Sequence, residues 1–149
     1  MIIVSKSLAE TQNFAKDFAQ KILKIKPTKK ALVIALEGEL GAGKTTFVQA
    51  FAKALGVKEN IVSPTFLLLK TYKVKHITYS ILVHIDAYRL KDEKDLPTLG
   101  FYDFLNDLTT VMLIEWADRV EKALPKDRIT IHFDHINEST RKIQISNFK

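Results

Sequence analysis

The sequence contains no cysteine in its 149 residues. This absence excludes disulfides, thiolate-bound metals, iron–sulfur clusters and cysteine nucleophiles, and it fits a reducing compartment. A long hydrophobic segment is also missing, because the longest apolar run, residues 31–36, is far shorter than the about 20 residues of a membrane helix. The N-terminus has no basic stretch ahead of a long apolar one. We therefore expect neither a signal peptide nor a membrane anchor.

Arginine is scarce as well, with only four in the chain: Arg89, Arg119, Arg128 and Arg141. The guanidinium fork is the group that reads guanine edges, so we do not expect an arginine-rich, base-reading surface. Lysine supplies most of the net charge of +6, which permits an anionic partner such as a nucleotide or RNA. Five lysines lie between Lys21 and Lys30. We interpret this segment as a solvated helix end and loop, and keep a patch for RNA or an acidic partner as the alternative.

Length and composition predict one folded domain over residues 1–149, since 46% of the residues are hydrophobic and 27% are charged. A capping box at Ser7–Glu10 opens a predicted helix that ends near Lys24. Helical spacing also predicts a helix from Phe47 to Leu55. A short helix is predicted over residues 99–105, and strands over residues 1–5, 31–37, 66–74, 77–85, 111–114, 127–133 and 142–146. The order predicts an α/β fold of three layers with a mostly parallel central sheet.

A glycine-rich segment follows the apolar strand at residues 31–37. It reads Gly38-Glu39-Leu40-Gly41-Ala42-Gly43-Lys44-Thr45 and fits the phosphate-binding pattern G-x-x-x-x-G-K-[ST] between a strand and a helix. The glycines allow backbone N–H groups to surround phosphate oxygens, and the helix N-terminus adds partial positive charge. Lys44 would reach the β- and γ-phosphates, and the Thr45 hydroxyl would bind Mg²⁺. The segment therefore predicts a P-loop NTPase that binds a nucleoside triphosphate with Mg²⁺.

Two carboxylates end apolar strands farther along the chain, Asp86 after residues 81–85 and Glu115 after residues 111–114. The carboxyl ends of parallel strands form the edge where α/β sheets bind ligands, and a P-loop enzyme needs an acid there for magnesium or water. Sequence reasoning leaves open which acid binds the metal. His84 lies on the same strand face as Asp86 and is interpreted as a packed histidine, while Trp116 is interpreted as core or lid.

The segment Ser63-Pro64-Thr65-Phe66 lies between the P-loop helix and the next predicted strand. Switch-type NTPases place a threonine in a loop at this position to sense the γ-phosphate. An ordinary proline turn is an equal interpretation of the same residues.

Taken in order, the segments GELGAGKTTFVQAFAKALG, SPTF, HIDAYRL and LIEW resemble the TsaE (YjeE) family over about Gly38–Trp116. The resemblance implies a cytoplasmic ATPase that works with the TsaB and TsaD proteins to modify the adenosine beside the tRNA anticodon, with tRNA contacted only indirectly. The chain departs from the family pattern in two places. Ala117 follows the tryptophan where the family usually has proline, and no acidic residue directly precedes the Leu99–Gly100 step.

The resemblance also implies roles for individual residues. Thr45 and Glu115 would hold Mg²⁺, and Lys44 and Asp86 would be catalytic, with Asp86 beside the γ-phosphate to polarise water. Thr65 would be the switch residue. The ATP-binding residues would be Thr11, Glu39, Leu40, Gly41, Ala42, Gly43, Lys44, Thr45, Thr46, Thr65 and Arg141.

Three other function classes compete with this ATPase. A small-molecule kinase usually brings several arginines over the phosphates, whereas the four here are dispersed, with Arg89 the one candidate near Asp86. A guanine-specific switch usually carries N-K-x-D, and none of the five asparagines precedes a lysine. An RNA-binding module built on Lys21–Lys30 would bind in a salt-dependent way and ignore ATP.

Overall fold

The computed structural model describes residues 1–39, 41–61 and 68–148. Its strands are β1 (Ile2–Ser5), β2 (Leu32–Glu37), β3 (Leu69–Lys73), β4 (Ile81–Asp86), β5 (Thr110–Glu115), β6 (Ile129–His135) and β7 (Arg141–Ser146). Its α-helices are α1 (Leu8–Ile22), α2 (Lys44–Ala54) and α3 (Phe101–Leu105). Short 3-10 helices lie at Glu93–Asp95, Pro97–Leu99 and Ala117–Ala123. No helix in the described part of the chain is long and apolar enough to cross a bilayer.

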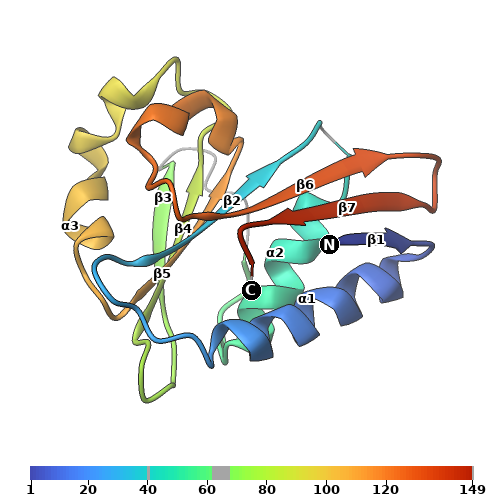
Figure 1. The fold of residues 1–149 in the computed structure, drawn as a ribbon, viewed down its shortest axis with the longest axis horizontal. Helices are drawn as coiled ribbons and strands as arrows, with labels where there is room; N and C mark the ends of the chain where they lie inside the picture. The colour runs from blue at the N-terminus through green and yellow to red at the C-terminus, as the bar shows by residue number, and fades with distance from the viewer. Residues whose placement is uncertain (40, 62–67, 149) are drawn as a thin grey trace.

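The strands form one mixed sheet in the order β1-β7-β6-β2-β5-β4-β3 (Figure 1). The pairs β6–β2, β2–β5 and β5–β4 are parallel, whereas β1–β7, β7–β6 and β4–β3 are antiparallel. The prediction of an α/β fold is confirmed, but the prediction of a mostly parallel sheet is wrong. The inner strands are apolar runs covered on both faces, which suits parallel pairing. Short turns join β3 to β4 and β6 to β7, and short turns can connect only antiparallel neighbours. Strands β1 and β7 pair antiparallel without such a turn, because they lie at opposite ends of the chain.

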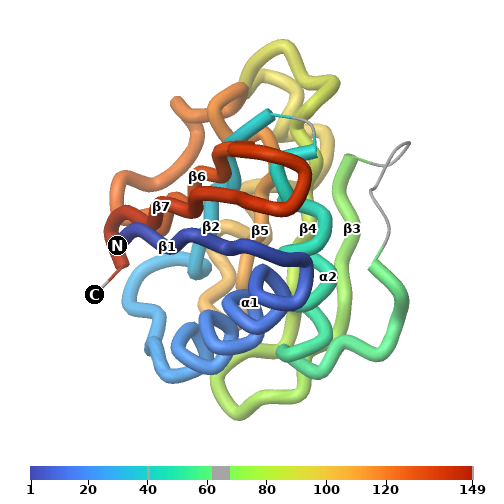
Figure 2. Tube along the Cα trace, turned by 90° about the vertical axis from the view of Figure 1, so that its right-hand side faces the viewer, coloured from blue at the N-terminus to red at the C-terminus, as the bar shows by residue number. Residues whose placement is uncertain are grey.

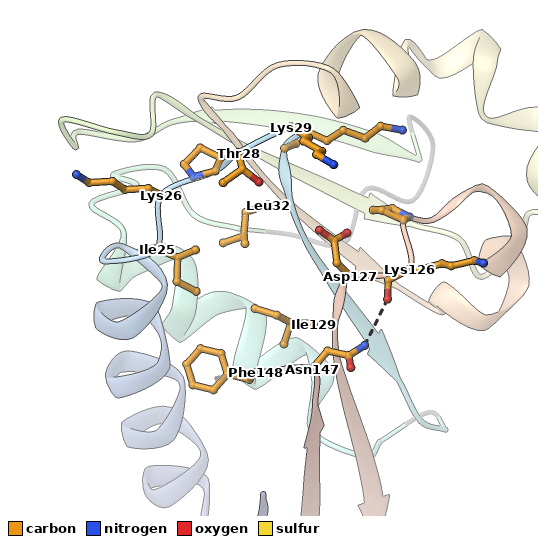
Figure 3. A pocket seen from close by; sticks show the side chains of 14 residues that line it. Ile25, Lys26, Thr28, Lys29, Leu32, Lys126, Asp127, Ile129, Asn147 and Phe148 are labelled. Atoms are coloured by element: carbon orange, nitrogen blue, oxygen red, sulfur yellow. Dashed lines mark hydrogen bonds between the residues drawn. The ribbon is translucent and has the colours of Figure 1, made fainter.

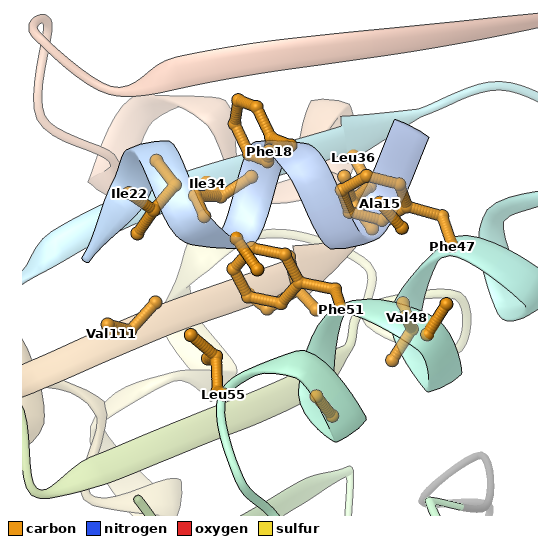
Figure 4. Packing of buried hydrophobic residues seen from close by; sticks show 14 of the residues in the cluster. Ala15, Phe18, Ile22, Ile34, Leu36, Phe47, Val48, Phe51, Leu55 and Val111 are labelled. Atoms are coloured by element: carbon orange, nitrogen blue, oxygen red, sulfur yellow. The ribbon is translucent and has the colours of Figure 1, made fainter. Parts of the chain in front are cut away.

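Two hydrophobic clusters occupy the two faces of the sheet. Helices α1 and α2 pack together over one face, where their aromatic residues meet the sheet (Figures 1 and 4). The ring of Phe47 lies 5.9 Å from that of Phe18, 5.6 Å from that of Phe51 and 5.6 Å from that of Phe133. Helix α3 and the 3-10 helices cover the other face with Leu96, Phe101 and other apolar side chains. The sheet therefore lies between two helical layers.

Several element boundaries differ from those predicted. Helix α1 begins where expected, with the Ser7 Oγ accepting from the Glu10 N–H at 3.1 Å, but it ends at Ile22. The strand predicted over residues 77–85 starts only at Ile81, and Ile77 is 99% exposed in the preceding loop. The strand predicted over residues 66–74 is described from Leu69 onward. The 3-10 helix after Trp116 was not predicted, because residues 117–123 show no clear apolar period.

The parallel strands place their carboxyl ends at one edge of the sheet. Strand β2 leads into the glycine-rich turn and α2, and β4 and β5 end beside it at Asp86 and Glu115. Figure 2, turned by 90°, shows β2, β5 and β4 side by side. The fold therefore collects the predicted phosphate and carboxylate residues at one edge.

Candidate functional site

The glycine-rich turn joins β2 to α2 with glycines at positive φ. Gly38, Gly41 and Gly43 have φ values of 131°, 76° and 101°, a region that disfavours residues with a Cβ. Gly43 is the residue directly before α2, so the backbone N–H groups of the first helical turn open onto the end of the loop. These are the features that an anion needs at a helix N-terminus.

Gly38 is required for a second reason, the close approach of strand β6. A Cβ built on Gly38 would lie well inside 3.0 Å of the Phe133 carbonyl oxygen and 3.3 Å from the Phe133 Cβ. By contrast, a Cβ on Gly41 would meet no described atom within 4 Å. Gly38 therefore lets the loop pack against β6, whereas Gly41 is needed only for its positive φ.

Lys44 is the buried cation of the site, with 5% of its surface exposed. Its Nζ donates a hydrogen bond to the Gly38 carbonyl and lies 3.7 Å from the centre of the Trp116 ring. Burial lowers the pKa of Lys44 below the ordinary lysine value, and the nearby carboxylates, Glu115 foremost, oppose that shift. The ammonium group thus has two protein partners in this structure, a backbone carbonyl and an aromatic ring.

A cavity of about 270 Å³ lies over this loop. It is lined by residues from the glycine-rich turn, α2, both strand ends and β7: Gly41, Gly43, Lys44, Thr45, Thr46, Asp86, Glu115, Trp116 and Arg141. All but Trp116 are residues that the sequence, or the family resemblance, assigned to ATP, Mg²⁺ or catalysis. The structure therefore brings most of the predicted site residues together.

The two carboxylates are direct neighbours in the sheet, because Asp86 pairs with Glu115 in the β4–β5 register. Asp86 is partly exposed and its Oδ1 accepts the Tyr88 N–H at 3.0 Å. Glu115 is buried, and its Oε2 lies 2.7 Å from the Nε2 of His84, which is only 1% exposed. The pair thus combines one accessible acid with one buried acid that a histidine contacts.

The donor set fits a magnesium ion that shares its ligands with a nucleotide. Among the described residues no three His, Cys, Asp or Glu side chains cluster into a metal site. Mg²⁺ is commonly held by one or two carboxylates together with substrate phosphates and water, in place of an all-protein cage. Thr45, Asp86 and Glu115 offer a hydroxyl and two carboxylates on the same cavity, which matches that need.

A smaller cavity of about 100 Å³ adjoins the first, and both are lined by Gly43, Thr46 and Arg141. Thr11 also lines it, and the Thr11 hydroxyl lies 2.7 Å from the Ser5 hydroxyl. Arg141 begins β7, opposite Ser5, and its Nη1 donates to the Asn137 carbonyl at 2.6 Å. The sheet thus brings Thr11 and Arg141, far apart in sequence, to one place beside the P-loop.

Other predicted residues lie elsewhere. Glu39 lines a neighbouring cavity of about 480 Å³ with Asp118 and Asp134, and not the cavity above Lys44. Ala42 is 1% exposed and supports the turn, its N–H donating to the Glu39 carbonyl at 3.2 Å. Leu40, Thr65 and the rest of the Ser63–Phe66 segment lie outside the described residues. Arg89 is exposed and does not line the cavity.

Two contacts at the site were missed by sequence reasoning. Trp116, interpreted as core or lid, covers Lys44, because its backbone turns to φ 57° directly after β5. His84, interpreted as a packed histidine, reaches the next strand and contacts Glu115. Neither contact has a sequence signal. The contact between His84 and Glu115 depends on the strand register, and the position of Trp116 depends on a left-handed backbone turn.

The lysine-rich segment lies at the opposite edge of the sheet. There a cavity of about 660 Å³ is lined by Ile25, Leu32, Ile129, Phe148 and four lysines, Lys26, Lys29, Lys30 and Lys126 (Figure 3). In Figure 3 the Lys26, Lys29 and Lys126 side chains extend away from the cavity, while Asp127 points toward its centre. These lysines are therefore arranged as a solvent-exposed rim, which both interpretations of the segment require.

Comparison with known proteins adds an independent line of information. The profile of the family described as "Threonylcarbamoyl adenosine biosynthesis protein TsaE" matches residues 5–143. A Haemophilus influenzae protein named "tRNA threonylcarbamoyladenosine biosynthesis protein TsaE" is 35% identical over 132 residues, covering 89% of this chain and 80% of its own length. A Rickettsia bellii protein of the same name is 37% identical over 139 residues, covering 93% and 89%.

The fold is also similar to a solved structure. The crystal structure of YdiB from Bacillus subtilis matches with a TM-score of 0.71 and 30% sequence identity, covering 96% of this chain and 82% of that one. The similarity therefore extends over nearly the whole chain.

Proposed function

This chain belongs to the TsaE family of tRNA threonylcarbamoyladenosine biosynthesis proteins, and from that membership we propose that it is a Mg²⁺-dependent ATPase serving this modification. One observation carries the proposal. The P-loop lysine and threonine share a cavity with two strand-end carboxylates, a combination suited to triphosphate, magnesium and water. The 270 Å³ volume accommodates the phosphate end of a nucleotide, and the adjoining cavity at Thr11 extends it.

The mechanism follows from charge placement, because phosphoryl transfer needs positioning and neutralisation more than covalent chemistry. Lys44 leaves Gly38 and Trp116 and neutralises the β- and γ-phosphates. Thr45 and Glu115 would hold Mg²⁺, and the ion would supply positive charge against the phosphate oxygens. Asp86, the more accessible acid, orients the attacking water.

Turnover by the chain alone is slow in this proposal. Arg89 points to solvent, and Arg141 is tied to the Asn137 and Thr140 carbonyls by its Nη1, at 2.6 and 3.1 Å. An arginine that stabilises the transferred phosphoryl group accelerates hydrolysis by about 10³–10⁵ where it is present. Faster hydrolysis would then depend on partners, for which the family resemblance suggests the TsaB and TsaD proteins in the cytoplasm, with tRNA as the indirect substrate.

The test measures nucleotide binding and turnover together. ATP with Mg²⁺ should raise the melting temperature by mass action, and GTP should raise it less. Lys44→Ala should abolish both the shift and hydrolysis. Lys53→Ala, a lysine exposed at the far end of the same helix, is the matched control and should change neither. Turnover should rise when the TsaB and TsaD proteins and tRNA are added.

Two results would contradict the proposal. Normal ATP hydrolysis by Lys44→Ala would exclude the glycine-rich turn as the phosphate site. Equal shifts with ATP and GTP would exclude a preference for adenine and favour a nucleotide-dependent switch.

A further inference from the structure

We propose that His84 is a positioning residue that holds the Glu115 carboxylate in the orientation needed to bind Mg²⁺. The inference rests on the proposed function, because it assigns a task within the same site. His84 does not line the cavity, so it acts through Glu115 and does not touch nucleotide or metal.

The contact is short, buried and made across two strands. His84 Nε2 lies 2.7 Å from Glu115 Oε2, and the two side chains are 1% and 8% exposed. In the β4–β5 register His84 pairs with Leu113, so Glu115 is its diagonal neighbour two residues farther along. Leu82, His84 and Asp86 alternate onto the sheet face that carries α1 and α2, where the P-loop helix begins.

The direction of the hydrogen bond follows from the chemistry of the two groups. A carboxylate only accepts, so His84 Nε2 carries the hydrogen and donates it. Within the described part of the chain, His84 Nδ1 is buried without a hydrogen-bond partner. Burying an unpaired polar atom costs folding free energy. We therefore infer that the ring is oriented for its one hydrogen bond, the bond to Glu115. That bond occupies Oε2 and leaves Oε1 as the oxygen for a metal.

Lys44 makes such a restraint necessary. The ammonium and the Glu115 carboxylate attract one another across the site. Without a fixed partner, the Glu115 side chain would turn toward Lys44 and form an ion pair. Such an ion pair would take the carboxylate away from the metal, whereas the triphosphate, with its several negative charges, would still draw Lys44 to itself. His84 holds the carboxylate from the sheet side and so keeps it available for the metal. Partners of this kind typically change metal affinity or activity by about 10–100-fold when they are mutated.

The experiment measures ATP affinity with Mg²⁺ and with EDTA in three variants. His84→Leu removes the donor at similar volume and should weaken Mg²⁺–ATP binding by about tenfold or more, with ATP binding in EDTA unchanged. His84→Gln places an amide N–H near the former Nε2 and should restore most of the Mg²⁺ effect. Leu82→Ala, on the same buried face of β4 but away from Glu115, is the control for general loss of packing and should not change the Mg²⁺ effect.

Each outcome decides one question. Equal weakening with Mg²⁺ and EDTA in His84→Leu, or no rescue by glutamine, would overturn the positioning role. An Mg²⁺ effect of the same size in Leu82→Ala would overturn it as well. Failure of the unmodified protein to bind ATP would instead refute the proposed function, so the two failures are distinguishable.

Discussion

Replacing Gly38 by alanine tests whether the first glycine of the loop serves packing as well as conformation. The substitution adds one methyl group that points at the Phe133 backbone of β6, closer than 3.0 Å to a carbonyl oxygen that cannot rotate away. It also forces alanine to adopt a φ of 131°. The loop and β6 must therefore separate, or the turn must change its backbone path.

Two contributions set the expected loss of folding free energy in Gly38→Ala. A residue with a Cβ in a disfavoured positive-φ conformation costs about 1–3 kcal/mol. Overpacking against a rigid neighbour adds about 1–3 kcal/mol. Gly41→Ala is the matched control, because its φ of 76° is also positive but its Cβ meets no described atom within 4 Å. The difference between the variants should thus contain the packing term together with the greater strain of a φ of 131° than of 76°.

The assay is thermal and urea unfolding of both variants beside the unmodified protein. For a chain of this length each kcal/mol shifts the melting temperature by roughly 2–4 °C. Gly38→Ala should therefore melt roughly 2–12 °C below Gly41→Ala. It should lose Mg²⁺–ATP binding as well, because a displaced turn no longer presents its backbone N–H groups to phosphate oxygens. Equal melting temperatures for the two variants would refute the argument from β6.

Further predictions concern the acids. Glu115→Ala should weaken ATP binding mainly when Mg²⁺ is present, whereas Asp86→Asn should keep Mg²⁺–ATP binding and lose turnover, and a reversed pattern would exchange their roles. Asp107 has its pKa lowered by hydrogen bonds from the Thr109 N–H and hydroxyl, both at 2.8 Å. Its contribution to stability is complete above the unfolded pKa and disappears as pH falls through the lower folded pKa. When the melting temperature is measured against pH, Asp107→Asn should therefore reduce its fall below about pH 4. An unchanged fall of the melting temperature would contradict this.

The sequence predicted the elements that follow one local rule. The capping box at Ser7 fixed the start of α1, and the apolar run before Gly38 gave β2 its length. The glycine pattern placed the turn between a strand and a helix. Each of these features depends on residues close together in the chain, so a local pattern was sufficient.

The antiparallel flanks of the sheet could have been predicted, because the short turns near Lys75 and at residues 136–140 imply antiparallel neighbours. The features that could not be predicted depend on strand order and register. The approach of Arg141 to the P-loop requires β7 to lie between β1 and β6. The His84–Glu115 contact requires β4 beside β5 in one specific register, which local patterns do not encode.

The position of Trp116 has a spectroscopic consequence. The chain contains a single tryptophan, and its indole ring is stacked against the Lys44 ammonium, with the Arg119 guanidinium 5.6 Å from the ring centre. Indole emission responds to nearby charge, and here that charge must move when phosphate replaces the ring as the partner of Lys44. The protein therefore carries an intrinsic fluorophore, free of background from other tryptophans. Its emission should report the proposed binding of nucleotide in real time, without any added label.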